Sequence, residues 1–448
     1  MKCIEDEIPF DLPDGWAWCR VSSIVQICLG LTHTPEYVEH GVPFYSVKDI
    51  SAGGLDTSDP KFISEEEFSQ FPSGAKPQKG DILFGRVGTL GKPTVVEIDE
   101  PFGIFVSLGF FRKIYADLSS TYIMSWMDSA LFWDQVNINV KGAVLTNLNT
   151  GWLSRFLIPI PPISEQKRIS NKVTRLMVLV DSILGERQQV SELLKKTKSK
   201  ILDLAIRGQL VPQNSDDEPA SVLLERIRAE KEELIKQGKI KRDHKESVIF
   251  KGEDNSYYEK IGGKVVNIDD EIPFELPENW VWCRGCSCFE GLGSTKPQGE
   301  FFDYIDIDAI DNRLHRIKEP KRLPVSDAPS RASRAVKSGS VLFSLVRPYL
   351  ENIALIEEKH SNCIASTGFY VCTSNGAFLP EFMFFLMISS YVVGGLNQYM
   401  KGDNSPSISK DNIENWLYPV PPLEEQQAIC SKLQSVFSLI ENVEQSLS

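Results

Sequence analysis

Two segments of this sequence are rich in Lys, Asn, Ser and Thr, and each opens with a Lys-Gly pair. They are "KGAVLTNLNT" (141–150) and "KGDNSPSIS" (401–409). Arg, Lys, Asn and Gln side chains pair with base edges, whereas Ser, Lys and backbone amides hold phosphates. For any single residue, a solvated surface position explains the side chain equally well. As a set, the candidate DNA contacts are Thr32, Lys48, Arg86, Lys92, Lys141, Asn147, Asn149, Lys296, Arg313, Arg316, Arg347, Tyr349, Lys401, Asn404, Ser405 and Ser407.

Residues that could do catalysis form no consistent site in the sequence. "GRVGTLGKP" (85–93) resembles a phosphate loop, but Pro93 follows Lys92 where Ser or Thr should hold magnesium. "CRGCSC" (283–288) has no second Cys/His pair at a zinc spacing. The five histidines have no paired-carboxylate setting. We therefore expect no catalytic residue and no metal, which counts against a nuclease or methyltransferase acting alone.

The composition is that of a globular protein with local basic stretches. A net charge of −13 over 448 residues excludes a uniformly basic nucleic-acid binder. Residues 313–347 nevertheless hold nine Lys/Arg against two Asp/Glu, so this stretch can meet phosphate locally.

The cellular setting is predicted from the cysteines and the apolar runs. Nine scattered cysteines favour a reducing cytoplasm. The most apolar run, 377–396, is interrupted by Pro380 and Glu381, which favours a buried helix over a membrane span.

Self-comparison shows that the chain is a tandem repeat. "DEIPFDLPDGWAWCR" (6–20) returns as "DEIPFELPENWVWCR" (270–284), and "IPIPPISEQKRI" (158–169) returns as "YPVPPLEEQQAI" (418–429). The edges of each copy match while the loops between them differ, as expected for one scaffold with two binding surfaces. Neutral drift of the loops explains the same pattern, so the repeat alone does not decide.

A long helix is expected after each proline motif. The prolines give a stiff, extended entry, and the acidic residues that follow suit a helix N-terminus. Apolar residues then recur at steps of three and four, which predicts an a/d seam against a partner helix. The seam residues are Ile169, Val173, Leu176, Val180, Ile183, Ile429, Leu433, Val436, Ile440 and Val443.

These patterns predict an α+β fold: two repeated, β-rich globular domains, each followed by a long helix that packs against a partner helix. The second helix is expected to be short or truncated, because it lacks a counterpart of "LLKKTKSKILDLAIRGQLVP" (193–212). The expected parts are a first domain (1–160), a first helix (161–210), a linker with a charged helix (211–266), a second domain (267–420) and a second helix (421–448).

The two P-x-P-P-[IL]-x-E-Q motifs, each after a variable domain that opens with "LPDGWAWCR" or "LPENWVWCR", resemble the specificity subunit of type I restriction–modification systems. "KSKILDLAIRGQLVP" (198–212) fits the same family. The resemblance implies that each domain is a target recognition domain that reads one half of a bipartite, asymmetric DNA site. It also implies that the two repeated domains are joined by two long antiparallel coiled-coil helices, which fix the spacing between the halves.

The family resemblance also implies which partners supply the chemistry. Two modification (methyltransferase) subunits and the restriction (translocase–nuclease) subunits would join the chain on double-stranded DNA. S-adenosylmethionine, ATP and magnesium would belong to those partners, and none to this chain. The alternative is a non-enzymatic coiled-coil scaffold whose duplicated domains bind proteins or glycans.

Overall fold

The structure, a computed structural model, divides into two compact units, Met1–Gly185 and Glu186–Ser448. The division falls inside one long helix, and each unit is described by itself. The described residues are 5–50, 54–87, 93–140, 147–240 and 246–447.

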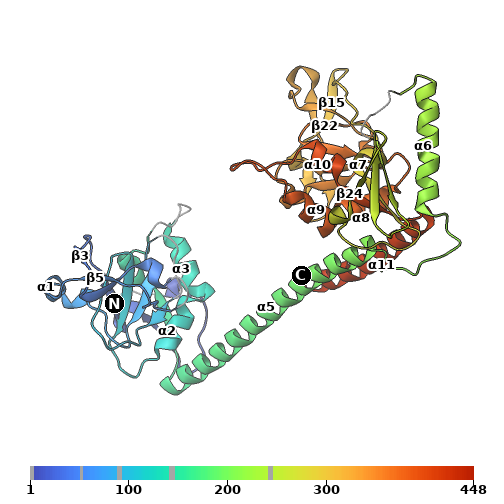
Figure 1. The fold of residues 1–448 in the computed structure, drawn as a ribbon. Coiled ribbons are helices and arrows are strands. Elements are labelled where there is room, and N and C mark those ends of the chain that lie inside the picture. The colour runs from blue at the N-terminus through green and yellow to red at the C-terminus, as the bar shows by residue number, and fades with distance from the viewer. Residues whose placement is uncertain (1–4, 51–53, 88–92, 141–146, 241–245, 448) are drawn as a thin grey trace. The chain divides into compact units, whose positions relative to one another are not determined.

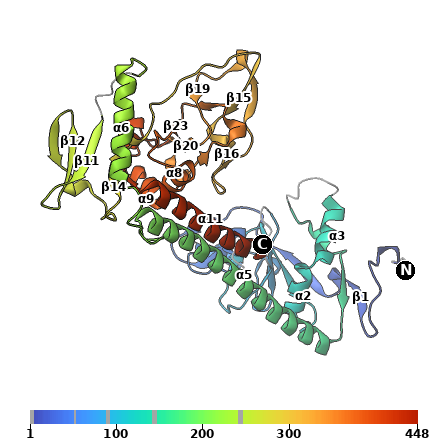
Figure 2. The ribbon, with the colours of Figure 1, turned by 90° about the vertical axis from the view of Figure 1, so that its right-hand side faces the viewer.

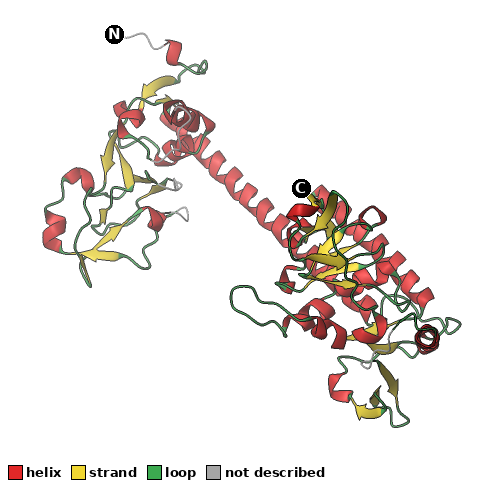
Figure 3. Cartoon of the chain, turned by 90° about the horizontal axis from the view of Figure 1, so that it is seen from above, coloured by secondary structure: helices red, strands yellow, loops and turns green. Residues whose placement is uncertain are grey.

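The first unit is built from short strands and a few helices separated by long loops (Figure 3). Its strands are β1 (Ala17–Arg20), β2 (Val25–Leu29), β3 (Tyr37–Val38), β4 (Val42–Tyr45), β5 (Lys61–Ile63), β6 (Ile82–Gly85), β7 (Thr94–Val95), β8 (Gly103–Ile104), β9 (Leu108–Lys113) and β10 (Leu157–Ile160). Its helices are α1 (Glu65–Ser69), α2 (Ser120–Met127), α3 (Ala130–Val140), α4 (Thr150–Leu153) and the first half of α5 (Ile163–Ile206).

The second unit repeats these elements and adds others. Its strands are β11 (Ser247–Lys251), β12 (Tyr257–Ile261), β13 (Lys264–Asn267), β14 (Val281–Arg284), β15 (Phe301–Ile305), β16 (Ile310–Asp311), β17 (Arg316–Ile317), β18 (Lys321–Pro324), β19 (Ala332–Ala335), β20 (Val341–Ser344), β21 (Ile353–Leu355), β22 (Ile364–Ser366), β23 (Phe369–Cys372) and β24 (Leu417–Val420). Its helices, after the second half of α5, are α6 (Ala220–Lys236), α7 (Gly285–Cys288), α8 (Pro380–Met387), α9 (Ser390–Asn397), α10 (Lys410–Asn415) and α11 (Leu423–Ser446).

Strand pairing confirms the internal repeat at the level of the backbone. The outer strands pair antiparallel in the same register, β1 with β10 and β14 with β24. Each unit also holds one parallel pair, with Phe44 opposite Gly103 in the first and Tyr304 opposite Ile364 in the second. The sheet orders are β2-β9-β6-β7 and β3-β5-β4-β8 in the first unit, and β21-β20-β23 and β18-β15-β22-β19 in the second.

The apolar run at 377–396 forms two short helices, α8 and α9, whose apolar side chains lie in the core of the second unit. Phe382, Leu386 and Val392 are completely buried there. Among the described residues, no helix combines the length and the hydropathy that a membrane crossing requires.

Each proline motif forms an elbow at the start of a long helix, and a buried glutamine holds each elbow in place. In the first elbow (161–166), Gln166 Nε2 donates to the Pro161 carbonyl at 2.9 Å, and the N–H of Ser119 donates to its Oε1 at 3.1 Å. Ser119 is the N-cap of α2, so one side chain joins the end of β10, the start of α5 and the start of α2.

The second elbow (421–426) repeats this arrangement with Gln426. Its Nε2 donates to the Pro421 carbonyl at 3.0 Å and to the Ala377 carbonyl at 2.9 Å, and its Oε1 accepts from the N–H of Leu379 at 2.7 Å. Leu379 is the N-cap of α8. Because both amide groups are buried, each hydrogen bond is costly to lose.

The glutamate that precedes each glutamine binds the tryptophan of the repeated LPxxW motif. Trp280 Nε1 donates to Glu425 Oε2 at 2.8 Å, and Trp16 Nε1 donates to Glu165 Oε2 at 3.2 Å. The LPxxW motif at the start of each copy and the proline motif at its end are therefore in direct contact.

Helix α11 lies alongside the C-terminal half of α5 within the second unit (Figures 1 and 2). Leu202 and Ile206 of α5 share a core with Ile429 and Leu433 of α11. Further along, Lys198 Nζ meets Glu444 Oε2 at 2.9 Å. Along this contact the residue numbers of α5 decrease while those of α11 increase, so the two helices run antiparallel.

Helix α5 ends where Gly208 reverses the chain. Gly208 has a φ of +69°, and the N–H of Gln209 donates back to the Leu204 carbonyl at 2.8 Å. A Cβ at Gly208 would lie 2.4 Å from Pro277 Cγ, which only glycine avoids.

The segment between α5 and the second domain is more structured than the sequence indicates. Its charged helix is α6, which begins after Pro219 as expected and buries Ala220 and Leu223. The remainder forms the antiparallel sheet β11-β12-β13, which the sequence pattern does not predict. Strand β12 supplies Glu259, a buried acid.

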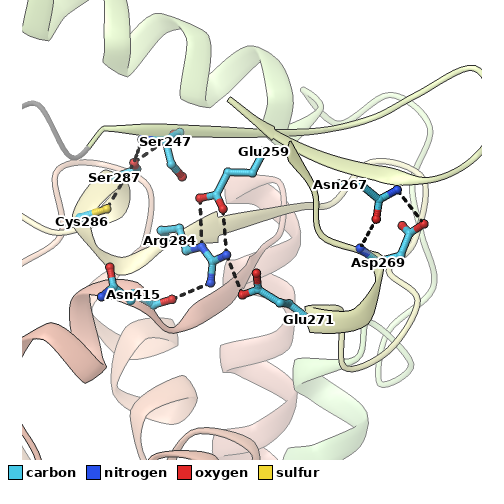
Figure 4. Close-up of polar contacts among 9 residues, drawn as sticks. All are labelled: Ser247, Glu259, Asn267, Asp269, Glu271, Arg284, Cys286, Ser287 and Asn415. Carbon is cyan, nitrogen blue, oxygen red and sulfur yellow. Dashed lines mark hydrogen bonds and ion pairs between the residues drawn. The ribbon is translucent and has the colours of Figure 1, made fainter. Parts of the chain in front are cut away.

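Glu259 closes an ion-pair cluster around Arg284, the last residue of the LPxxWxWCR motif (Figure 4). Arg284 donates to both oxygens of Glu259 at 3.0 and 2.8 Å, to Glu271 at 2.8 Å and to the Asn415 carbonyl at 2.8 Å. Burial raises the pKa of Glu259, but the hydrogen bonds and charge of Arg284 outweigh burial and lower that pKa overall. The cluster ties the inserted sheet to the second domain.

Substitution Glu259→Ala is expected to destabilise the second unit by about 3–5 kcal/mol, because it leaves a buried arginine without its main partner. The matched control is Glu271→Ala, whose carboxylate is 54% exposed and should cost below about 1 kcal/mol. Because the pKa of Glu259 is lower in the folded state, its ionised carboxylate stabilises the fold at pH values above its unfolded-state pKa. This contribution is lost as the pH falls through the folded-state pKa. Urea unfolding of both variants measures the difference, and equal losses would contradict the assignment.

Glu425 is expected to show the opposite pH dependence. Burial raises its pKa, which the hydrogen bonds from Trp280 and Gln213 only partly offset. The folded state therefore holds this proton more tightly than the unfolded state, and stability falls as the pH rises above about 4.3, the usual glutamate value.

Substitution Glu425→Gln keeps a hydrogen-bond acceptor for Trp280 and should remove this loss of stability at higher pH. Substitution Glu425→Ala leaves the donors of Trp280 and Gln213 without an acceptor and should lower the free energy of unfolding by about 1–3 kcal/mol. Thermal unfolding between pH 4.5 and 7.5 measures both. A wild-type-like pH slope in Glu425→Gln would contradict the prediction.

Candidate nucleic-acid interface

Two loops of the second unit are joined edge to edge beyond the end of β20. The first loop runs over 345–352 and the second over 401–407. The N–H of Ile408 donates to the Leu345 carbonyl at 2.9 Å, and the N–H of Arg347 donates to the Pro406 carbonyl at 2.7 Å. Lys401 and Ser407 exchange both backbone hydrogen bonds at 3.0 Å, which closes the second loop.

A hairpin formed by β16 and β17 (310–317) joins the first of these loops. Asn312 Nδ2, at its turn, donates to the Leu350 carbonyl at 2.7 Å. We call the two loops and this hairpin together the rim. The rim carries eight of the residues proposed from sequence, namely Arg313, Arg316, Arg347, Tyr349, Lys401, Asn404, Ser405 and Ser407.

The proposed side chains on the rim are accessible, apart from Ser407, which is half-buried. Arg347 Nη2 donates to the Asn404 carbonyl at 2.8 Å, so its guanidinium is held against the neighbouring loop. Its other N–H groups remain available, because guanidinium carries five donors. The rim therefore combines positive charge, amides and hydroxyls on pinned backbone, the donor set that contacts bases and phosphates.

Much of the positive charge in residues 313–347 is neutralised by nearby carboxylates. Lys321, Arg322, Arg331 and Lys337 each form an ion pair, with Asp308, Asp303, Asp306 and Glu290 respectively. Within the described parts of the chain, the other five basic residues of this stretch form no such pair. Arg313, Arg316 and Arg347 lie on the rim, and Lys318 and Arg334 lie outside it.

Lys296 is exposed but belongs to a different loop. That loop is attached to β19, where the N–H of Thr295 donates to the Ser333 carbonyl at 2.9 Å. No contact between Lys296 and the rim is recorded among the described residues.

Arg86 in the first unit is used inside the protein. It is 8% exposed, and its guanidinium donates to the Leu148 and Val106 carbonyls at 3.1 Å and to Asn147 Oδ1 at 3.0 Å. Burial lowers its pKa. The arginine therefore positions the segment that carries Asn147, and each of its three guanidinium nitrogens already donates one hydrogen bond inside the protein.

The backbone of the first unit shows where its counterpart of the rim lies. The N–H of Leu148 donates to the Arg86 carbonyl at 2.8 Å, which matches the bond between Ile408 and Leu345. Arg86 thus corresponds to Leu345. Lys92 and Lys141 lie outside the described residues.

The remaining candidates of the first unit are exposed but separate. Thr32 follows Leu31, which bridges to Phe105, and Lys48 lies in a short 3-10 turn after β4. The side chain of Asn149 accepts from the N–H of Gly151 at 2.7 Å as the N-cap of α4. Asn147 and Asn149 lie near each other because they are two residues apart in the sequence. No hydrogen bond or ion pair given for the described residues joins them to Thr32 or Lys48.

The proposed seam residues fall into two groups. On α11, Ile429 and Leu433 are completely buried, Ile440 is 7% exposed, Val436 is half-buried and Val443 is exposed. On α5, Ile169 packs on the core of the first unit and Val173 is half-buried, whereas Leu176, Val180 and Ile183 are 46–54% exposed. The α5 residues that share a buried core with α11 are instead Leu202, Ala205 and Ile206.

Residues that sequence reasoning missed are those that fix the elbows and the rim. They include Gln166 and Gln426, Asn312, and Glu259. The repetition of Glu-Gln after both proline motifs was a usable signal for the two glutamines. In the described parts of the chain, no group of three or more His, Cys, Asp or Glu is placed to hold a metal ion.

Comparison with known proteins relates this geometry to one family. Residues 332–448, which include both loops of the rim and α11, match the "Type I restriction modification DNA specificity domain". The EcoAI specificity subunit of Escherichia coli is 25% identical, covering 96% of this chain and 79% of that protein. The MjaVIII specificity subunit of Methanocaldococcus jannaschii is 22% identical, covering 96% of this chain and 88% of that protein.

The chain is similar over nearly its full length to type I specificity subunits. A chain solved in work on complex assembly and conformational transition of the type I R-M system has the same fold. It matches with a TM-score of 0.63 at 16% identity and covers 98% of this chain and 94% of that one. The predicted α+β fold is thereby confirmed.

Proposed function

We propose that this chain is the DNA-recognition subunit of a type I restriction–modification complex, in which each repeated domain reads one half of a bipartite, asymmetric site. The observation that carries the proposal is the rim of the second unit, in a chain similar over nearly its full length to specificity subunits. Its arginines, lysine and amide are held on backbone that is hydrogen-bonded in place before any DNA arrives. Such preorganisation favours specific recognition.

In this proposal the chain itself catalyses nothing. Two modification (methyltransferase) subunits and the restriction (translocase–nuclease) subunits supply the chemistry, together with S-adenosylmethionine, ATP and magnesium. The cytoplasmic location also stays a prediction. The scaffold alternative, with protein- or glycan-binding domains, is not favoured by the comparisons, because the relatives are specificity subunits of restriction enzymes.

The long helices are proposed to set the spacing between the two half-sites. Helix α5 has 44 residues, which corresponds to about 66 Å or roughly two turns of DNA. A glutamine-locked elbow at the start of each helix fixes the angle at which the chain leaves each domain. A flexible linker would leave that spacing undefined.

Exchange of one domain tests the proposal. Replacing residues 20–140 with those of a relative should change one half of the methylated site and leave the other half and the complex intact. Sequencing of modified bases in a host that carries the methyltransferase subunit measures this. The matched exchange, at 285–416, should change the other half only. Unchanged sites in both exchanges would contradict the proposal.

Substitution Lys401→Ala is expected to weaken binding of the assembled complex to specific and non-specific DNA about equally. Loss of one phosphate contact should reduce the slope of log affinity against log salt concentration by about 1. Lys236→Ala, on the exposed face of α6, serves as the control and should leave the slope unchanged. Fluorescence anisotropy between 50 and about 200 mM salt covers the range in which this dependence is large. A slope for Lys401→Ala equal to that of the control would contradict the contact.

A further inference from the structure

The rim contains most of the unusual backbone of the described chain. Of the four non-glycine residues with positive φ in the described parts, three lie on the rim: His315 at 49°, Arg347 at 48° and Glu351 at 55°. Arg347 also precedes Pro348, and a residue before proline normally adopts an extended conformation. Non-glycine residues in the left-handed region are strained and persist only where the surroundings determine them.

Hydrogen bonds on both sides hold this strained loop. The N–H of Leu350 donates to the Arg347 carbonyl, and the N–H of Glu351 donates to the Pro348 carbonyl, both at 2.9 Å. Pro348 is buried beneath the turn. The bond from Asn312 to the Leu350 carbonyl then ties the turn to the β16–β17 hairpin.

The side chains that this rigid turn and hairpin expose are apolar. Leu314 is 56% exposed, Tyr349 46% and Leu350 39%. A single exposed leucine needs no explanation, but these three lie on two loops that are hydrogen-bonded to each other. They are flanked in sequence by Arg313, Arg316 and Arg347, the rim arginines without an ion pair in the described chain.

We propose that Leu314, Tyr349 and Leu350 form an apolar wedge that enters the base stack of the DNA half-site read by the second domain. Duplex DNA presents phosphates outside and stacked bases inside, which matches apolar tips between arginines. Apolar side chains that enter between base steps partly unstack them and kink the duplex. The inference rests on the proposed function and adds a mode of recognition to it.

This wedge differs from the contacts expected of the arginines and Lys401. Phosphate contacts affect all sequences alike and depend on salt. Insertion instead favours steps that unstack easily, so it contributes to specificity with little salt dependence.

The test uses the full chain in complex with its methyltransferase subunit and a duplex that carries the site found by sequencing of modified bases. The analogue 2-aminopurine is placed at successive steps of the half-site of the second domain, where its fluorescence rises on unstacking. The wild-type complex should raise the fluorescence at one step. The triple variant Leu314→Ala, Tyr349→Ala, Leu350→Ala should abolish the rise.

Affinity gives a second readout. Tyr349→Ala alone should weaken specific binding by about 5- to 150-fold, the range found when stacking side chains are removed. Non-specific binding and the salt slope should stay unchanged. Tyr349→Phe keeps the ring and should bind within about twofold of wild type. Leu439→Ala, at a leucine on α11 that is 64% exposed, is the control for general loss of apolar surface.

The outcomes separate the wedge from the proposed function. A wild-type complex without sequence preference would overturn both. A wild-type complex with normal preference but no fluorescence rise at any step, or a triple variant that keeps the rise, would overturn the wedge alone. Loss of assembly with the methyltransferase subunit in the triple variant would mark these residues as a protein-docking surface and also overturn the wedge.

Discussion

The architecture depends on one buried side chain used twice, the glutamine at the start of each long helix. In both copies this amide donates to the proline carbonyl just before the long helix, Pro161 or Pro421. It also accepts from the backbone N–H at the start of a second helix, α2 or α8, which caps the domain. The neighbouring glutamate binds a tryptophan from the opening motif of the same copy. Each elbow therefore closes its domain on itself, so that the direction of the long helix is set by the domain core.

This constraint explains how the loops can differ while the edges of the repeat remain similar. The outer strands, the elbow and the capping helices form a closed frame in each copy, as the matching registers of β1–β10 and β14–β24 show. The rim loops of the second unit take no part in the hydrogen bonds of the elbow. Different recognition surfaces can be built there without changing the angle at which α5 or α11 begins.

The sequence predicts the frame of each domain better than the contacts that its candidate DNA-binding residues make. Repeated motifs and a 3.6-residue periodicity are local signals, and they located both elbows, α5 and α11. Periodicity does not reveal which part of a helix has a partner, so Leu176, Val180 and Ile183 were assigned to a seam and lie exposed. The sheet β11-β12-β13 has few residues in each strand and takes part of its support from Glu259 and Arg284, which no local pattern shows.

Arg86 and Arg347 illustrate the same limit at the candidate site. Both follow similar strands, yet one is buried in three internal hydrogen bonds and the other is exposed on a strained turn. Their environments depend on loops some sixty residues away, at Asn147 and at Asn404. Residue type and spacing predict that both arginines are candidates. Only their long-range contacts show that Arg86 is buried and positions a neighbouring segment, whereas Arg347 is exposed.

The most direct test of this account is site-specific photocrosslinking from the rim to DNA. A photoreactive phenylalanine analogue at Asn404, in the full chain assembled with its methyltransferase subunit, should crosslink to one half of the methylated site and to no other position. The same analogue at Lys236 on α6 is the control. Crosslinks from position 404 to both halves, or a yield no greater than that from position 236, would contradict the claim that the rim reads one half-site.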